Sequence, residues 1–96
     1  MTTSKVYEYD IGTEIKLDAG TDLTGYQTLE IHYLKEDGTE GIWSASHVET
    51  TKARYITASG DITPNGKWKL KIFVVMSGGD QWFGNTVEMP VYEKWA

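Results

Sequence analysis

Hydrophobic and polar residues alternate with a period of two along most of the chain. In the clearest run, 67–76, the hydrophobic residues Trp68, Leu70, Ile72 and Val74 alternate at first with lysines. Such alternation is typical of strands that bury one face and expose the other. It predicts about seven strands, at residues 5–9, 13–17, 28–35, 41–48, 53–58, 67–76 and 81–92. No segment shows a convincing helical period.

Short turn sequences separate the predicted strands. Asp-Gly at 37–38 and Gly-Gly at 78–79 provide residues that adopt the positive φ angles of tight hairpins. We therefore expect one hairpin between the third and fourth strands and another between the sixth and seventh. The last strand should break near Gly84–Asn85. Pro90 has no amide hydrogen to donate, so we expect a sheet edge or a bulge at that position.

Seven short strands separated by turns are typical of an immunoglobulin-like β-sandwich, in which two antiparallel sheets pack face to face. We therefore predict an all-β fold and a single domain comprising residues 1–96. Trp43 lies about where such domains carry a core tryptophan. The chain contains no cysteine, so the core must be held by packing alone.

The charge and the chain termini narrow the class of protein. A net charge of −5 argues against a nucleic-acid surface, which needs an excess of clustered lysine and arginine. The first ten residues contain no apolar run, so we expect no signal peptide and synthesis in the cytoplasm. No stretch approaches the ~20 apolar residues of a membrane helix. We therefore expect neither a nucleic acid nor a membrane as partner.

Residues suited to catalysis or metal binding are present, but their spacing does not indicate a site. Neither His32 nor His47 has a second histidine or a carboxylate at the spacing of metal ligands. The aspartates concentrate in turns and lack the spacing of a calcium loop. There is no Gly-x-Ser-x-Gly motif and no recognisable Ser–His–acid triad. We therefore predict a protein without catalytic residues, metal or cofactor.

The alternation at 67–76 changes part-way. Phe73 and Val75 lie on the face that carries lysines earlier in the strand, and Leu34 is also out of step with its neighbours. The adjacent residues Trp82 and Phe83 must point to opposite faces of a strand. These residues either form an apolar contact surface, or a loop or the C-terminal sequence YEKWA covers them. The candidate interface residues are Leu34, Phe73, Val75, Trp82 and Phe83.

Three segments carry a resemblance to known proteins: DIGTEIKLDAGTDLTGYQTLEIHYLKEDGTEGIWSA (10–45), YITASGDITPNGKWKLKIFV (55–74) and GNTVEMPVYE (84–93). Their recurring elements are the turns at Leu23–Gly25, Lys35–Thr39 and Gly60–Asp61, and the motif Gly66–Leu70 before a long strand. They resemble the immunoglobulin-like domain found at the N-terminus of phage upper baseplate proteins and in related small tail or virion proteins. The resemblance spans about nine-tenths of the chain.

The resemblance implies a structural or adaptor domain of a phage or prophage virion, without catalytic residues. Its partners would be other phage structural proteins or further copies of itself, and its location the virion. The alternative is a carbohydrate-binding sandwich that recognises bacterial surface glycans. In that case Tyr26, Trp82 and Tyr92 would be the residues that stack on sugar rings.

Overall fold

The computed structural model of the protein describes residues 6–93 and 95. Within these residues the chain forms nine strands: β1 (Val6–Tyr7), β2 (Glu14–Asp18), β3 (Tyr26–Leu34), β4 (Glu40–Ser44), β5 (Ser46–Val48), β6 (Lys52–Ile56), β7 (Gly66–Met76), β8 (Gln81–Phe83) and β9 (Val87–Tyr92). The described residues include no helix, and hence none that is long and apolar enough to cross a membrane.

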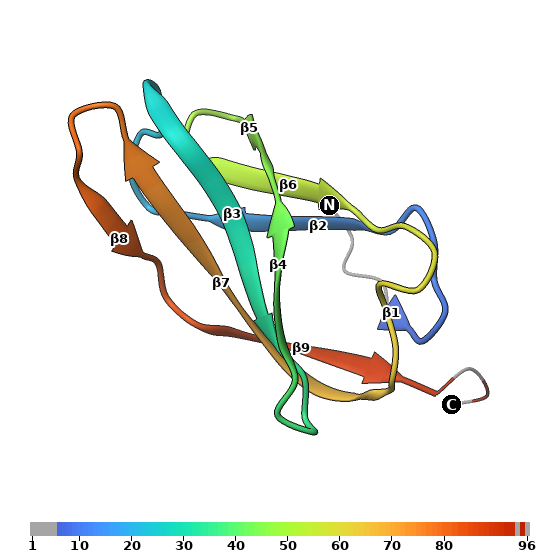
Figure 1. Cartoon of the computed structure of the whole chain (residues 1–96). Helices are drawn as coiled ribbons and strands as arrows, with labels where there is room; N and C mark the ends of the chain where they lie inside the picture. The colour runs from blue at the N-terminus through green and yellow to red at the C-terminus, as the bar shows by residue number, and fades with distance from the viewer. Residues whose placement is uncertain (1–5, 94, 96) are drawn as a thin grey trace.

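The strands form two sheets that pack face to face as a β-sandwich (Figure 1). The larger sheet has the order β1-β9-β7-β3-β4, with β8 also paired to β7, and the smaller has the order β2-β6-β5. Neighbouring strands are antiparallel except β1 and β9, which run parallel. The predicted all-β, immunoglobulin-like sandwich is confirmed.

Each of the seven predicted strands is present, and two of them are divided. The break predicted near Gly84 separates β8 from β9. The predicted strand 41–48 is also two strands, because β4 pairs with β3 of the larger sheet whereas β5 pairs with β6 of the smaller one. The chain crosses from one sheet to the other at Ala45, whose amide donates to the carbonyl oxygen of Leu29 at 3.0 Å.

The larger sheet is built around β7, its longest strand. β3 pairs with one side of β7, while β8 pairs with residues 73–75 and β9 with residues 66–70 on the other side. Between β8 and β9 the amide of Gly84 donates to the carbonyl oxygen of Ile72 at 2.9 Å. A Cβ atom at Gly84 would lie 2.5 Å from Cγ2 of Ile72, so this close approach requires glycine.

Pro90 lies in β9, opposite Lys67 of β7. The amide of Glu8 donates to the carbonyl oxygen of Tyr92 at 2.8 Å, so the backbone groups of Tyr92 point away from β7. Backbone groups two residues apart on a strand point the same way, so the nitrogen of Pro90 also faces away from β7. Within the described chain β1 pairs only with Val91 and Tyr92, so Pro90 lies at an open sheet edge, as predicted.

The core lies between the two sheets and has two clusters. β7 contributes to both, because its inward residues Trp68, Leu70, Ile72 and Val74 are all buried. The first cluster contains Ile15, Ile31, Trp43, Ile62, Trp68, Leu70, Met89 and Val91. The second contains Leu23, Leu29, Ala53, Ile72 and Val74. Each fully buried side chain of this kind contributes roughly 1.5–3 kcal/mol.

Four aromatic rings stack at the centre of the first cluster. The ring centroids of Trp43 and Tyr55 lie 4.8 Å apart with an angle of 10° between the planes. Tyr33 lies 4.6 Å from Trp43 and 5.5 Å from Trp68. Tyr55 belongs to the smaller sheet and the other three residues to the larger sheet, so this aromatic stack joins the two layers. Each such pair contributes about 0.5–1.5 kcal/mol beyond the burial of its area.

Tyr33 reaches the aromatic stack across a glycine. Its cross-strand partner is Gly41 on β4, and a Cβ atom there would lie 2.2 Å from Cζ and the hydroxyl oxygen of Tyr33. The ring therefore occupies space that is free only because residue 41 has no side chain.

We expect Gly41→Ala to lower the free energy of unfolding by about 2 kcal/mol or more, because the added methyl would displace the Tyr33 ring. Denaturant unfolding followed by tryptophan fluorescence measures the change. Gly78→Ala is the matched control, since a Cβ there meets nothing within 4 Å and φ lies outside the left-handed region. The control should change stability by less than about 0.5 kcal/mol, and equal effects would contradict the packing described for Tyr33.

The hydroxyl of Tyr55 anchors the aromatic stack to a turn. It donates to Oδ2 of Asp61 at 2.5 Å, and the same oxygen accepts the amide of Ala58 at 2.6 Å. Burial, followed by the hydrogen bond to Asp61 and the charge of that carboxylate, raises the pKa of Tyr55 to about 12. The ordinary pKa of tyrosine is about 10.

This shift predicts a loss of stability at high pH. A pKa that is higher in the folded than in the unfolded state stabilises the fold fully below about pH 10, and this contribution disappears as the pH rises to about 12. We expect the wild-type protein to lose on the order of 1–2 kcal/mol over this range beyond the loss of a Tyr55→Phe variant. Denaturant unfolding at pH 9, 10, 11 and 12 tests this, and parallel profiles would contradict it.

Candidate protein-interaction surface

One face of the larger sheet points away from the smaller sheet and carries the odd-numbered residues of β7. At the start of β7 these residues are Lys67 and Lys69, which are exposed, followed by the half-buried Lys71. From Phe73 onward the same face becomes apolar, as the sequence predicts. The even-numbered residues of β3 lie beside them on this outer face, because the register pairs His32 with Lys71.

Phe73, Phe83 and His32 form an aromatic cluster on the outer face. β8 places Phe83 opposite Phe73, with 4.8 Å between the ring centroids. The ring of His32 lies 5.2 Å from Phe73 and 5.3 Å from Phe83, meeting Phe83 at 83°. Nζ of Lys71 lies 5.2 Å from the centroid of Phe83, within the range of a cation–π interaction. The three rings therefore support one another from three different strands.

Further apolar residues extend this cluster. Val75 follows Phe73 on β7, Leu34 follows His32 on β3, and Ile42 of β4 lies opposite His32. We refer to Leu34, Ile42, Phe73, Val75 and Phe83 as the outer patch. Four of these residues are predicted from the sequence. Ile42 is not among them, although it has the same parity as the outward Ser44 and could have been found from that signal.

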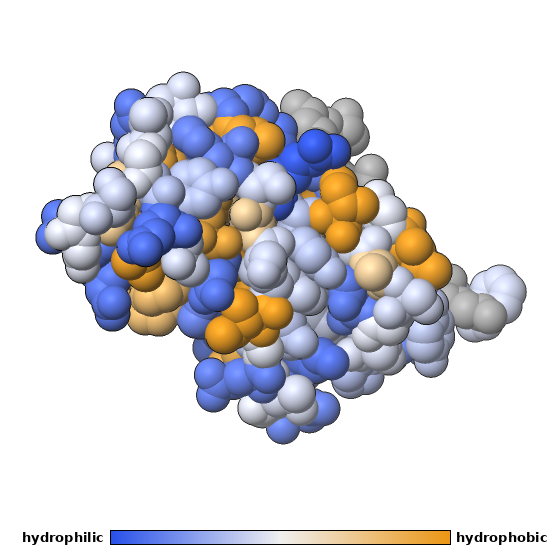
Figure 2. All heavy atoms as spheres, turned by 45° about the horizontal axis from the view of Figure 1, so that its top comes forward, coloured by the Kyte–Doolittle hydropathy of each residue, from blue (hydrophilic) through white to orange (hydrophobic). Residues whose placement is uncertain are grey.

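The outer patch differs from ordinary exposed apolar residues. Large hydrophobic side chains are also exposed at Tyr9, Ile11 and Ile56. On the face seen in Figure 2, hydrophobic residues form several separate patches among polar residues. Single exposed side chains of this kind are common on soluble proteins. Phe83 is 52% exposed, and its ring lies against the ring of His32. Ile42 is 56% exposed and is the cross-strand partner of His32 on β4.

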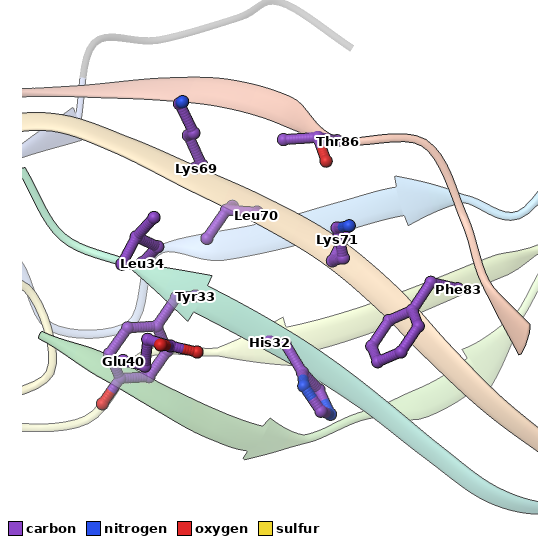
Figure 3. A pocket seen from close by; sticks show the side chains of 9 residues that line it. All are labelled: His32, Tyr33, Leu34, Glu40, Lys69, Leu70, Lys71, Phe83 and Thr86. Atoms are coloured by element: carbon purple, nitrogen blue, oxygen red, sulfur yellow. The ribbon is translucent and has the colours of Figure 1, made fainter. Parts of the chain in front are cut away.

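A shallow hollow of about 370 Å³ lies beside the outer patch (Figure 3). Leu34 and Phe83 lie on opposite sides of it, and Lys69 and Lys71 extend from β7 (Figure 3). Neither lysine forms an ion pair with another described residue. The hollow therefore combines apolar walls with two lysines that have no carboxylate partner among the described residues. Its full lining is His32, Tyr33, Leu34, Glu40, Lys69, Leu70, Lys71, Phe83 and Thr86.

Ile42 and Phe83 keep the outer patch open to solvent, whereas Leu34, Phe73 and Val75 are half-buried. The sequence left open that the C-terminal YEKWA folds over it, but β9 pairs with the beginning of β7 whereas Phe83 pairs near its end. In Figure 1 the end of β9 and the strand β8 accordingly lie at opposite ends of the larger sheet. Lys94 and Ala96 lie outside the described residues.

Trp82 is not part of the outer patch. Its partner on β7 is the fully buried Val74, and its side chain packs against the second core cluster. Trp82 and Phe83 point to opposite faces, as the alternation requires. The pairing register of β8 on β7 decides which of the two faces inward, and the sequence of β8 alone does not contain that information.

The three residues that would stack on sugar rings in a carbohydrate-binding domain lie apart. Tyr26 pairs with Met76 at the end of β7, whereas Tyr92 follows the partner of Gly66 at its beginning. A strand rises about 3.3 Å per residue, so roughly 30 Å separates the two ends of β7. Trp82 points toward the core. The three rings therefore do not form a common platform.

The turn aspartates and His47 form hydrogen bonds within the fold. Asp18, Asp22 and Asp37 form hydrogen bonds to the residues two positions further on, and these hydrogen bonds lower the pKa of each carboxyl. His47 lies in the smaller sheet, where its Nε2 is 2.7 Å from the carbonyl oxygen of Thr50. In residues 6–93 and 95, no three histidine, aspartate or glutamate side chains come together in a way that could hold a metal ion.

Comparison with known proteins supports the fold. The sequence matches no family model and no curated protein. Among solved structures, the crystal structure of CopC from Methylosinus trichosporium OB3b is similar, with a TM-score of 0.61 and 17% sequence identity. The match covers 95% of this chain and 87% of that chain. At this identity the likeness establishes the β-sandwich fold alone.

The opposite orientations of Trp82 and Phe83 predict different costs of truncation. We expect Trp82→Ala to lower the free energy of unfolding by about 2 kcal/mol or more, because it removes a ring from the second core cluster. Phe83→Ala should cost less than about 1 kcal/mol, since about half of that ring is already in water. Denaturant unfolding of both variants measures these losses. Equal losses, or a larger loss for Phe83→Ala, would contradict these orientations.

Proposed function

We propose that the chain is a non-catalytic structural or adaptor domain of a phage or prophage virion, and that it acts through protein–protein contacts. The observation that carries this proposal is the outer patch, which gathers apolar side chains from four strands around His32. Apolar clusters that remain exposed on a small soluble domain mark interaction sites when polar residues surround them.

The composition of the outer patch is that of an interface centre. Phe73 and Phe83 are rigid rings whose conformation is fixed by mutual contact and by His32. Aromatic residues of this kind carry much of the binding energy in protein interfaces, and charged residues lie at the rim. Lys69 and Lys71 provide such a rim on one side. A fitting partner would place apolar side chains on the rings and carboxylates near these lysines.

The phage assignment rests on the sequence resemblance. Its recurring elements correspond to the turn before β3, the hairpin between β3 and β4, and the first half of β7. The partners we propose are other phage structural proteins or further copies of this chain, in the virion. Neither a nucleic acid nor a membrane is part of the proposal. The carbohydrate-binding alternative is not favoured, because Tyr26, Trp82 and Tyr92 do not share a platform.

Incorporation into particles tests the proposal. Particles of the phage or prophage that encodes the chain should contain it at a constant ratio to the other structural proteins, as measured by quantitative mass spectrometry after gradient purification. We expect Phe83→Ser to reduce this ratio at least tenfold, which corresponds to a loss of about 1.4 kcal/mol at an interface centre.

Ile56→Ser is the matched control. Ile56 is also an exposed apolar residue, but it lies on β6 of the smaller sheet. This variant should be incorporated like the wild type. Particles that contain their other structural proteins but lack the chain, or that incorporate Phe83→Ser normally, would contradict the proposal.

A further inference from the structure

Strand β4 is an open edge of the larger sheet. It pairs with β3 on one side and with no described strand on the other. The hydrogen bond from Ala45 to Leu29 shows that the odd-numbered residues at this edge turn their backbone groups toward β3. Because these directions alternate along an antiparallel strand, the N–H and C=O groups of Glu40, Ile42 and Ser44 point out of the sheet.

The other described edges are protected against pairing with a further strand. β1 has two residues, and β5 and β8 have three each. β2 is longer but carries charges at Glu14, Lys16 and Asp18, and β9 contains Pro90. Short strands, charges and proline are the usual means by which sheet edges avoid association. β4 has five residues, no proline, and a single charge at its first residue.

We infer that two copies of the chain associate by antiparallel pairing of β4 with β4 of a second copy, around a two-fold axis at Ile42. In this register Ile42 faces Ile42 of the second copy, and Glu40 faces Ser44. The outward backbone groups of the three residues then form about six hydrogen bonds, two for each bonded pair. Pairing stops at Ala45, where the chain leaves for the smaller sheet.

The side chains of β4 favour a second copy of the same strand in this register. The two-fold axis keeps the glutamates apart, because each lies opposite a serine. A parallel arrangement would place Glu40 beside Glu40, and like charges directly opposite destabilise a strand pair. On the inner face Trp43 would lie opposite Gly41, so a large residue meets a small one. On the outer face the two exposed Ile42 side chains would cover each other.

The association should be concentration-dependent and weak, with a dissociation constant on the order of 10–100 μM, because it uses one short strand per copy. It rests on the proposed function, in which further copies of the chain are among the partners, and assigns their contact to the backbone of β4 and not to Phe73 and Phe83. Ile42 belongs to both surfaces, so the experiment must separate them.

Sedimentation velocity of the purified chain over about 1–500 μM provides the first test. We expect Ile42→Lys and Ile42→Glu each to weaken self-association at least tenfold, because like charges would meet on the two-fold axis. An equimolar mixture of the two variants should associate again, because opposite charges would then face each other. Ile56→Lys, a matched change on β6 of the smaller sheet, and Phe83→Ser should leave the association unchanged.

Hydrogen exchange provides the second test, at the level of the backbone. The amides of Glu40, Ile42 and Ser44 should exchange about four- to ninefold more slowly at 500 μM than at 1 μM, which is the change in the fraction of monomer that this range of dissociation constants gives. Those of Gly41 and Trp43 should change little. A monomer throughout the concentration range would overturn the inference. So would association that Ile42→Lys leaves intact, or that leaves the three outward amides unprotected. Loss of association in Phe83→Ser would also overturn the inference, because it would place the contact between copies at the outer patch. The proposed function is tested separately, by incorporation into virions.

Discussion

The two sheets are joined through the rings of Trp43 and Tyr55, which lie nearly parallel with their centroids 4.8 Å apart. The chain has no cysteine, so this stack provides across the sheets a contact that a disulfide could otherwise provide. It also constrains the chain path. Trp43 must lie in the larger sheet beside Tyr33, and two residues later the chain crosses at Ala45 to pair with the strand that carries Tyr55. β4 is therefore short and remains an edge.

The outer face of the larger sheet is not needed to hold the two sheets together. The inward residues of β7 supply both core clusters along the whole strand, so the fold is complete without Phe73 or Val75. A strand that needed only solubility on its other face could continue the lysines that begin it. Instead, Phe73 lies against Phe83 and His32, which come from two different strands. Independent strands that converge on one apolar cluster are better explained by a contact surface than by the requirements of the core.

The sequence predicts those features that depend on local alternation and turn chemistry. The strands, both hairpins, the break at Gly84 and the outward direction of Phe73 and Val75 are of this kind. Features that depend on pairing between distant strands are not predictable in this way. The alternation continues through Ala45 although the chain changes sheets there, so the pattern predicts a single strand. The inward direction of Trp82 and the separation of Tyr26 from Tyr92 likewise follow from register on β7.

The outer patch and the open edge meet at Ile42, and this position connects the two proposals physically. Antiparallel pairing of β4 continues the larger sheet across the two-fold axis, so the outer faces of both copies would lie side by side on one surface. The two outer patches would then present paired sites at a fixed separation. A partner that is itself repeated, as structural proteins of a particle are, could engage both at once. The second contact would then be intramolecular, and avidity could exceed the affinity of one patch by about 10²–10⁴-fold without any new contact.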